Sequence, residues 1–539
     1  MANPSRAWNW LSIPPAHHEG SEWRSMTIAD HARSLTKADL GFIAISDERR
    51  DLTRREWLDE AQALAAALQK RGYGAGDVIA FQLPNWHEAA VIDLAAALAG
   101  LVIVPIVPIY RDAEVRLMLA DSGARALFTC AEFRNYDFAA MAARVQRELP
   151  QLEDIFVVRG DDTLGEDYAS LVQQGAQLDL KEIEVDPKGV KMVLYTSGTT
   201  GRPKGVLHSH TTLDHVLDHS AAHWGVNEGD TLIMPSPVTH ISGFANGLEM
   251  PLVRGTRTIL MERWDAAEAV ALIDRHRVSG TVAATPFLVE LADTARKAGT
   301  RLPSLRWFAC GGAAVPPELI PSARKAFDNL VAFRVFGASE VPLVTYGWPD
   351  NPELAATTDG EVVDYQVRIV DEEGRDLPPG EEGEILAHGP AMMLGYSDEE
   401  QTRAAIDERG FFRTGDLGRL TADGALTVTG RKKDLIIRGG ENISAVEIED
   451  VLRAHPGLQD VSVVAMPHDR LGEGVCAYCI AGDEPPAIGD LVDHVINSGL
   501  AKQKIPERFE FVADFPRTAS GKVRKDQLRK DIARKLADA

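Results

Sequence analysis

The segment TSGTTGRPKG, residues 196–205, decides the fold of this chain, and it directly follows the strand-like run VKMVLY at residues 190–195. Its three glycines allow a tight backbone turn whose N–H groups can bind an anion. Its four hydroxyl groups and Lys204 add donors that suit phosphate oxygens. A Walker A loop needs Ser or Thr after the lysine, whereas Gly205 follows Lys204 here, which excludes a P-loop kinase. The segment therefore predicts a phosphate-binding loop of another kind.

Composition and charge limit the class of protein. The chain carries 57 basic and 80 acidic side chains, and its formal net charge of -23 repels nucleic-acid phosphates and anionic lipid. We therefore expect no nucleic-acid partner. One basic stretch is an exception, because residues 502–535 hold 11 Lys and Arg against 5 Asp and Glu. Such a stretch is typical either of a solvated helix face or of a surface that meets a phosphorylated ligand.

Neither a secretory signal nor a membrane span is expected. The N-terminal segment lacks a basic start followed by an apolar core. The most apolar stretch, residues 89–110, contains Asp93, Gly100 and two prolines, whereas a membrane span needs about 20 apolar residues without such breaks. A buried helix followed by a buried strand is the better interpretation. The few cysteines form no disulfide framework, and we predict a cytoplasmic protein without stable membrane insertion.

Helical and strand-like segments alternate along the chain, which predicts α/β architecture. Thr53 and Glu56 form a capping box that predicts the start of a helix. The run VIAFQL at residues 78–83 predicts a strand covered on both faces. A basic run later precedes the short strand-like segment DLIIRGG, and enough residues follow it for a separate small domain. The predicted domains are residues 1–432 and 433–539.

The segment TSGTTGRPKG closely resembles the phosphate-loop signature of the adenylate-forming superfamily, which includes acyl-CoA synthetases, adenylation domains of peptide synthetases and beetle luciferases. The resemblance implies a large N-terminal α/β domain of several subdomains and a small C-terminal α+β domain, joined by a hinge. It covers most of the chain, because further segments match the family in the right order. These segments are GGAAVP (311–316), VFGASE (335–340), RTGDLG (413–418), GRKKDLIIRGGENIS (430–444) and PRTASGKVRK (516–525).

The resemblance also implies where ATP binds. GGAAVP resembles the adenine-binding segment, and Asp416 occupies the place of the aspartate that binds the ribose hydroxyls. Phe336 departs from the usual Tyr, so its ring can stack on adenine but donates no hydrogen bond. The residues with an implied role in ATP binding are Thr196, Ser197, Gly198, Thr199, Thr200, Gly201, Lys204, Gly311, Gly312, Ala313, Phe336, Gly337, Ser339, Asp416 and Arg431.

Three residues have implied catalytic roles. Glu340 would ligate Mg²⁺, and Lys522 in the last motif would be the catalytic lysine of adenylation. His240, in SPVTHISG, matches a position that guards the acyl pocket and shifts between the two half-reactions. No protein nucleophile is implied.

The remaining implied features concern coenzyme A and the acid. Lys433 lies where the family places the pivot between domains. Gly439 and Gly440 would line the channel for the pantetheine arm, because only glycine lets a thiol approach the backbone closely. The residues expected to line the acyl pocket are Phe244, Phe287, Phe336, Ala338 and Val341. None of them is charged, which predicts an apolar acid of the medium-chain, alicyclic or aromatic class.

Together these implications predict an ATP-dependent carboxylate–CoA ligase, which forms an acyl-adenylate and pyrophosphate and then an acyl-CoA thioester and AMP. Its partners would be a small carboxylic acid, ATP, Mg²⁺ and coenzyme A, and a homodimer stays open. An amino-acid adenylation domain is disfavoured, because residues 241–244 contain no acid to pair an α-amino group. Transfer to an acyl-carrier protein and a luciferase-type oxygenase stay open as alternatives. A non-catalytic nucleotide-binding protein is disfavoured by the presence of Lys522 and Glu340.

Overall fold

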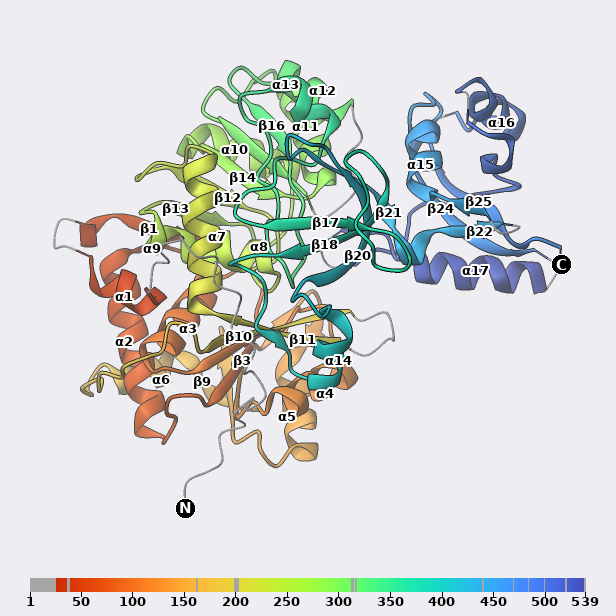
Figure 1. Cartoon of the computed structure of the whole chain (residues 1–539). Coiled ribbons are helices and arrows are strands. Elements are labelled where there is room, and N and C mark those ends of the chain that lie inside the picture. The colour runs from red at the N-terminus through yellow and green to blue at the C-terminus, as the bar shows by residue number, and fades with distance from the viewer. Residues whose placement is uncertain are drawn as a thin grey trace.

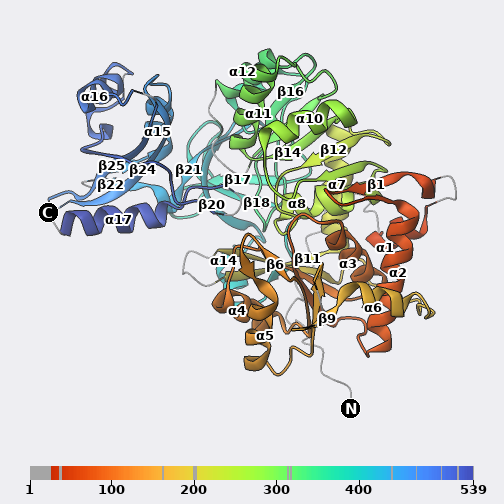
Figure 2. The same ribbon diagram turned by 180° about the vertical axis from the view of Figure 1, so that it is seen from behind.

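The N-terminal part of the chain is built around two large sheets, each flanked by helices, as the computed structural model shows (Figures 1 and 2). No helix in the described part of the chain is long and apolar enough to span a lipid bilayer. The residues that the structure describes are 26–35, 39–160, 163–197, 203–311, 315, 318–438, 441–468, 470–482, 484–498, 500–518 and 521–537.

The first large sheet has eight strands in the order β19-β11-β10-β4-β3-β5-β8-β9. Strands β10, β4, β3, β5 and β8 pair in parallel, and β11 returns antiparallel to β10. The run VIAFQL forms β3, in which all five residues are buried, so the prediction of a strand covered on both faces is confirmed. The strands are β3 (Val78–Gln82), β4 (Val102–Pro105), β5 (Ala126–Cys130), β8 (Asp154–Val158), β9 (Glu166–Asp167), β10 (Val190–Ser197), β11 (Pro203–Ser209) and β19 (Gly395–Tyr396).

Helix α2 begins at the predicted capping box. The Thr53 hydroxyl accepts a hydrogen bond from the Glu56 backbone N–H at 3.2 Å, and the Glu56 carboxylate accepts one from the Thr53 N–H at 2.9 Å. The apolar stretch 89–110 forms the fully buried helix α3 and then strand β4, as expected. Helices of this region are α1 (Ile28–Arg33), α2 (Arg54–Lys70), α3 (His87–Leu98), α4 (Asp112–Ser122), α5 (Phe138–Glu148) and α6 (Tyr168–Gly175), with the small hairpin β6 (Glu132–Phe133) and β7 (Tyr136–Asp137).

The second large sheet has seven strands in the order β16-β15-β14-β12-β13-β1-β2. All its pairings are parallel except that of β1 with β2. Its strands are β1 (Ile43–Ser46), β2 (Asp51–Thr53), β12 (Thr231–Met234), β13 (Arg257–Leu260), β14 (Gly280–Ala283), β15 (Trp307–Cys310) and β16 (Val331–Arg334). Its helices are α7 (His210–His223), α8 (Ile241–Gly243), a π-helix (Phe244–Glu249), α9 (Met250–Val253), α10 (Ala266–His276), α11 (Thr285–Ala298), α12 (Leu319–Ala326) and α13 (Pro352–Thr357).

A smaller antiparallel sheet, β17-β18-β20-β21, leads into the C-terminal unit, which lies beside it in Figure 1. The elements of this sheet are β17 (Gln366–Val370), β18 (Gly383–His388), α14 (Glu399–Ala405), β20 (Phe412–Leu420) and β21 (Leu426–Arg431). The elements of the C-terminal unit are β22 (Ile436–Arg438), β23 (Glu441–Ile443), α15 (Ala445–Arg453), β24 (Leu458–His468), β25 (Gly472–Ala481), α16 (Ile488–Asn497), β26 (Arg508–Phe511) and α17 (Lys525–Ala537).

The predicted architecture, a large N-terminal α/β part and a small C-terminal α+β part, is confirmed. The connection between them is a single 3-10 turn, Lys432–Asp434, which separates β21 from β22. The predicted division between residues 432 and 433 falls within this turn, and it stays a prediction.

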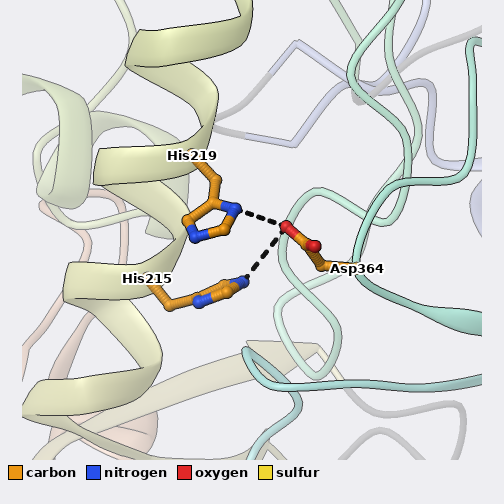
Figure 3. Close-up of side chains that lie close together, drawn as sticks. All are labelled: His215, His219 and Asp364. Atoms are coloured by element: carbon orange, nitrogen blue, oxygen red, sulfur yellow. Dashed lines mark ion pairs between the residues drawn. The ribbon is translucent and has the colours of Figure 1, made fainter. Parts of the chain in front are cut away.

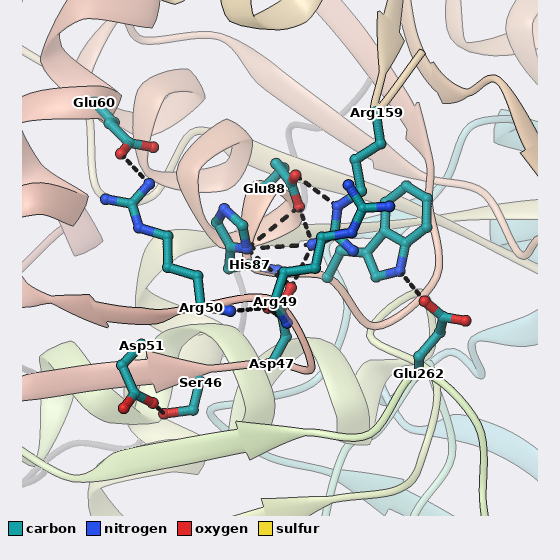
Figure 4. A network of polar contacts seen from close by, with 11 residues as sticks. Ser46, Asp47, Arg49, Arg50, Asp51, Glu60, His87, Glu88, Arg159 and Glu262 are labelled. Carbon is teal, nitrogen blue, oxygen red and sulfur yellow. Dashed lines mark hydrogen bonds and ion pairs between the residues drawn. The ribbon is translucent and has the colours of Figure 1, made fainter.

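A buried ionic network ties β1 to α3 and to the segment after β8 (Figure 4). The Arg159 guanidinium donates to both carboxylate oxygens of Glu88, at 2.7 and 2.8 Å, and also to Asp47. Its Cζ lies 4.0 Å from the centroid of the Trp86 ring. Burial opposes ionisation of Asp47, but hydrogen bonds from His87 and the charge of Arg159 hold its pKa below the usual range. The network therefore holds the Asp47 carboxylate as an anion in the protein interior.

Replacing Arg159 should destabilise the N-terminal part strongly. Arg159→Ala leaves Asp47 and Glu88 buried without their cation, which costs about 3–5 kcal/mol. The measurement is the urea unfolding curve followed by tryptophan fluorescence. Arg403→Ala is the matched control, because Arg403 forms an exposed pair with Glu399 whose loss costs less than about 0.5 kcal/mol. Equal unfolding midpoints for the two variants would contradict the importance of the network.

Candidate active site

The β10–β11 hairpin carries the predicted phosphate loop. Thr196 pairs with Lys204 across the hairpin, so both ends of the loop are fixed by the first large sheet. The Lys204 ammonium lies 4.9 Å from the centroid of the Tyr396 ring on the neighbouring strand β19. The predicted ATP-binding residues that lie outside the described residues are Gly198, Thr199, Thr200, Gly201, Gly312 and Ala313, together with the side chain of Ser197.

Glu340 is joined to the same strand. The Tyr396 hydroxyl donates to Glu340 Oε1 at 2.8 Å, and the backbone N–H of Met393 donates to the Glu340 carbonyl at 2.8 Å. Tyr396 therefore contacts both Lys204 and Glu340, two residues far apart in the sequence. Sequence reasoning missed Tyr396, because no local motif marks it.

His208 positions the segment that contains Ser339. Its Nε2 lies 2.7 Å from the Ser339 carbonyl oxygen, and since that oxygen only accepts, Nε2 carries the hydrogen. Burial lowers the pKa of His208 to about 4, so the ring is neutral at neutral pH. The sequence offered no reason to assign a role to His208 beyond its position shortly after the predicted phosphate loop; in the structure it lies in β11 and links that strand to Ser339.

At two of the predicted ATP-binding glycines, Gly311 and Gly337, the neighbouring atoms leave no room for a Cβ atom. A Cβ atom on Gly337 would lie 2.3 Å from the Leu343 backbone nitrogen, and one on Gly311 would lie 2.8 Å from Val335 Cγ2. A larger residue at position 311 would therefore push against the segment after β16, and one at position 337 would distort the turn within that segment. Phe336 is buried, and its N–H donates to the Thr345 hydroxyl at 2.7 Å.

Asp416 and Arg431 face each other across strands β20 and β21. The Arg431 guanidinium donates to the Asp416 carboxylate at 2.7 Å. Burial raises the pKa of Asp416, while Arg431 and Lys522 oppose that change. The two residues predicted to bind ribose therefore form one ion pair, at the edge of the N-terminal part where the C-terminal unit begins.

Lys522, in the C-terminal unit, interacts electrostatically with this ion pair. Its backbone N–H donates to the Thr518 hydroxyl at 3.1 Å, and its carbonyl accepts from the Thr518 N–H at 2.7 Å, which fixes a tight turn before α17. Lys522 is an exposed residue, yet protein atoms crowd the region around it. This crowding and the charge of Arg431 lower the pKa of Lys522 to about 8, although Asp416 and Glu340 favour the charged form.

His240 also interacts electrostatically with Lys522. It precedes the short helix α8, and its Nε2 is buried without a hydrogen-bond partner among the described residues. Burial, and then the charge of Lys522, lower the pKa of His240 to about 4. The imidazole is therefore neutral at neutral pH. Lys522 thus interacts electrostatically with four other predicted residues that are far apart in the sequence: Glu340, Asp416, Arg431 and His240.

The residues predicted to line the acyl pocket do not form one group. Ala338 and Val341 share a hydrogen bond of 3.1 Å and pack in the cluster that contains Phe336. Phe287 packs edge-on against Trp264 in a second cluster. Phe244 is fully buried in a third cluster, with its ring centroid 4.8 Å from the Lys191 ammonium. The role of each in binding an acid stays a prediction, as do those of Lys433, Gly439 and Gly440, of which the two glycines lie outside the described residues.

Comparison with known proteins identifies the family of this chain. Residues 33–397 match the model of the AMP-binding enzyme family, and residues 447–522 match the AMP-binding enzyme C-terminal domain. The chain belongs to the AMP-binding enzyme family. The resemblance to the adenylate-forming superfamily is thereby confirmed.

Relatives of this AMP-binding enzyme extend over nearly its whole length. A medium-chain fatty-acid–CoA ligase of Escherichia coli (strain K12) is 34% identical over 97% of this chain and 93% of its own length. A 2,3-dihydroxybenzoate-AMP ligase of Bacillus subtilis (strain 168) is 33% identical over 95% of both chains. The crystal structure of ATP-bound MatB from Rhodopseudomonas palustris is 27% identical, with a TM-score of 0.82 over 94% of this chain and 99% of that one. Family and relatives together indicate an ATP-dependent, AMP-forming acid ligase.

The lowered pKa of Lys522 predicts an alkaline limit to adenylation. An ammonium with a pKa of about 8 loses its charge as the pH rises through that value. We expect kcat/KM for adenylation, which reports groups of the free enzyme, to fall above about pH 8. The measurement is ATP–pyrophosphate exchange across the neutral and alkaline range.

Lys522→Arg is the control for this pH dependence. A guanidinium stays protonated throughout the range, so the variant should be slower but should lose the alkaline fall. The same fall in both proteins would assign the titration to another group.

Proposed function

We propose that this AMP-binding enzyme is a carboxylate–CoA ligase that activates an apolar acid in two steps. Adenylation of the acid by ATP releases pyrophosphate, and transfer of the acyl group to coenzyme A releases AMP. The observation that carries the proposal is the position of Lys522. Together with burial, its positive charge lowers the pKa of His240, and it opposes the rise in the pKa of Asp416 that burial causes. The Glu340 carboxylate in turn favours the charged form of Lys522. A cation from the C-terminal unit thus lies among the polar groups of the N-terminal part.

The first step requires two anions to meet. An oxygen of the acid carboxylate attacks the α-phosphorus of ATP, and the bond from that phosphorus to the bridging oxygen of pyrophosphate breaks. The protein supplies charge neutralisation at this point. Lys204 would hold the β- and γ-phosphates at the end of the β10–β11 hairpin, and Lys522 would bridge the carboxylate and the α-phosphate. Asp416 would accept hydrogen bonds from the ribose hydroxyls, oriented by its ion pair with Arg431.

Glu340 fits the binding of Mg²⁺. Its carboxylate provides the oxygen ligands that this hard cation prefers, and the Tyr396 hydroxyl holds Oε1 and thereby orients Oε2. Bound Mg²⁺ would neutralise charge on the phosphates. Tyr396 would keep Glu340 at a fixed position beside Lys204, so that carboxylate and ammonium approach the same triphosphate from one side.

The second step requires a different arrangement of the C-terminal unit. The thiolate of coenzyme A attacks the acyl carbonyl, the bond from the carbonyl carbon to the phosphate oxygen breaks, and the thiol proton has already passed to solvent. Lys522 would obstruct that approach, so the C-terminal unit would rotate about Lys433 and bring Gly439 and Gly440 to the site. Such a rotation is a hinge motion of the domain-closure kind. His240, neutral and beside the acyl position, could turn aside without breaking an ion pair.

The acid is inferred from the chemistry of the predicted pocket. Phe336, Ala338 and Val341 form one apolar wall, and a charged group buried against it would lose its solvation without compensation. The E. coli relative is named for a medium-chain fatty acid, which agrees with an apolar substrate. We therefore propose a medium-chain, alicyclic or aromatic monocarboxylate.

A second candidate acceptor is an acyl-carrier protein. The B. subtilis relative is named as an AMP ligase, and it matches this chain as completely as the CoA ligase does. The two are separated by assaying thioester formation from the purified enzyme, ATP and acid with either coenzyme A or a phosphopantetheinyl carrier protein. Turnover with coenzyme A alone supports the proposal, and turnover only with the carrier overturns the choice of acceptor.

Lys522→Ala should separate the two half-reactions. The variant loses the cation of the first step, and the loss of a few kcal/mol of transition-state stabilisation slows adenylation about a hundredfold or more. Thioester formation from synthetic acyl-adenylate should stay near the wild-type rate, because Lys522 is withdrawn in that step. Single-turnover kinetics of each half-reaction provide the measurement.

Lys530→Ala is the control for removal of a positive charge from the same basic stretch, because Lys530 lies on α17, several positions beyond the site. It should leave both rates unchanged. An equal decrease of both half-reactions in Lys522→Ala would mean that Lys522 does not act in adenylation alone.

A further inference from the structure

Two histidines of α7 and one aspartate from a distant segment converge on a single point at the protein surface (Figure 3). His215 and His219 lie one helical turn apart, and their rings stack with centroids 3.9 Å apart. Both face Asp364, which lies in the segment before β17. His215 Nε2 is 3.5 Å from Asp364 Oδ2, and His219 Nδ1 makes an ion pair with the same oxygen.

The scaffold on both sides of this cluster is fixed. Asp364 adopts a left-handed backbone conformation with φ of 59°, which a non-glycine residue adopts only where its surroundings require it. Next to it, the buried Tyr365 hydroxyl donates to the Pro342 carbonyl at 3.3 Å. At the end of α7, the Trp224 indole N–H donates to the Tyr346 carbonyl at 2.7 Å. Helix and loop therefore present the three side chains from independently anchored positions.

The chemistry of the cluster suits a transition metal. Hydrogen bonds from His215 and then His219 lower the pKa of Asp364, so its carboxylate is an anion at neutral pH. The two imidazole nitrogens and the carboxylate oxygen all lie within 4.8 Å of one another. Zn²⁺ binds imidazole and carboxylate at about 2.0–2.2 Å with tetrahedral geometry. The ligand atoms around such an ion lie closer together than 4.8 Å, so small side-chain movements would bring these three atoms to ligand distance.

We propose that His215, His219 and Asp364 form a binding site for a divalent transition metal of the Zn²⁺ class, with water in the remaining position. The ion would take the place of the ring hydrogens that point at the carboxylate. Each neutral imidazole would bind it through that nitrogen and carry its hydrogen on the other one, and a protonated ring would first release one proton to solvent. His219 is 41% exposed, which gives the ion a path to the site. Imidazole ligands select such metals over Mg²⁺, so the site is chemically distinct from the one at Glu340.

A second group of similar composition shows what disfavours a metal. The possible ligand atoms of this second group, Asp47, His87 and Glu88, also lie within 4.8 Å of one another. The Arg159 guanidinium already bridges both carboxylates of that group and supplies its positive charge (Figure 4). The group of His215, His219 and Asp364 has no Arg or Lys in ion-pair contact with its carboxylate among the described residues. A metal cation would supply the charge there.

A metal ion bound by His215, His219 and Asp364 would link α7 to the segment that follows Glu340. Asp364 is next to Tyr365, which holds Pro342, and α7 follows directly on β11 of the phosphate-loop hairpin. The site would therefore join two segments that both lead to the proposed ATP site. We expect it to act as a structural clamp, because no ligand of the metal is a residue of that ATP site.

The test is a titration of untagged, metal-free protein with Zn²⁺ by calorimetry, and with Co²⁺ by visible absorption. We expect one saturable equivalent, Co²⁺ bands of a site with nitrogen and oxygen ligands, and a higher unfolding temperature with Zn²⁺ because the ion binds the folded state. Excess Mg²⁺ should not displace the ion. His219→Ala and Asp364→Asn should each weaken Zn²⁺ binding about tenfold or more, because each removes one of three ligands.

His494→Ala is the matched control, because His494 and His455 also form a ring contact but belong to no three-ligand group in the described part of the chain. It should leave Zn²⁺ binding unchanged. Circular dichroism establishes that each variant is folded, and Asp364→Asn keeps the shape of the side chain. The proposal is overturned by wild-type protein that binds no Zn²⁺ saturably, or by unchanged affinity in both ligand variants, which would leave a purely hydrogen-bonded cluster.

Discussion

The meeting of two anions is the constraint on which this molecule depends. An acid carboxylate and a triphosphate repel each other, and the cation that we propose to lie between them, Lys522, comes from a different unit than the rest of the proposed site. Lys522 interacts electrostatically with Asp416 and Glu340 because the C-terminal unit lies beside the smaller sheet, joined to it by the turn at Lys432–Asp434. The position of one small unit thus decides whether the proposed site is complete.

The N-terminal part supplies a rigid surface for this encounter. Strands β10 and β11 fix both ends of the phosphate loop, and Tyr396 on β19 contacts Lys204 and Glu340 at once. Behind this surface, Lys191 on β10 is buried with Asp93 and Glu249, and burial raises the pKa of Glu249 to about 8. The strand that leads into the predicted phosphate loop is therefore held by the polar contacts of Lys191 in the protein interior as well as by apolar packing.

Local features of the fold were predictable from the sequence, because their causes are local. The capping box at Thr53, the buried strand of residues 78–82 and the helix–strand order of residues 89–110 follow from periodicity and side-chain chemistry. The architecture came from the resemblance of TSGTTGRPKG and later segments to a known superfamily, and the family comparison confirms it.

Contacts between distant segments could not be predicted in this way. Nothing near Tyr396 indicates that its hydroxyl meets Glu340, and nothing near His208 indicates that it holds Ser339. The predicted acyl residues show the same limit, because Phe244 and Phe287 share an apolar character but belong to separate hydrophobic clusters. Residue type indicated an apolar lining, while the tertiary fold alone decides which side chains each of these residues packs against.

A crystal structure of the enzyme with ATP and an unreactive analogue of the acid tests the role of Lys522 most directly. Lys522 Nζ should lie within about 3 Å of an oxygen of the α-phosphate or of the acid analogue, a hydrogen-bonding distance. Asp416 should contact the ribose hydroxyls in the same complex. A complex in which another cation occupies that position, while Lys522 contacts neither ligand, would contradict the account.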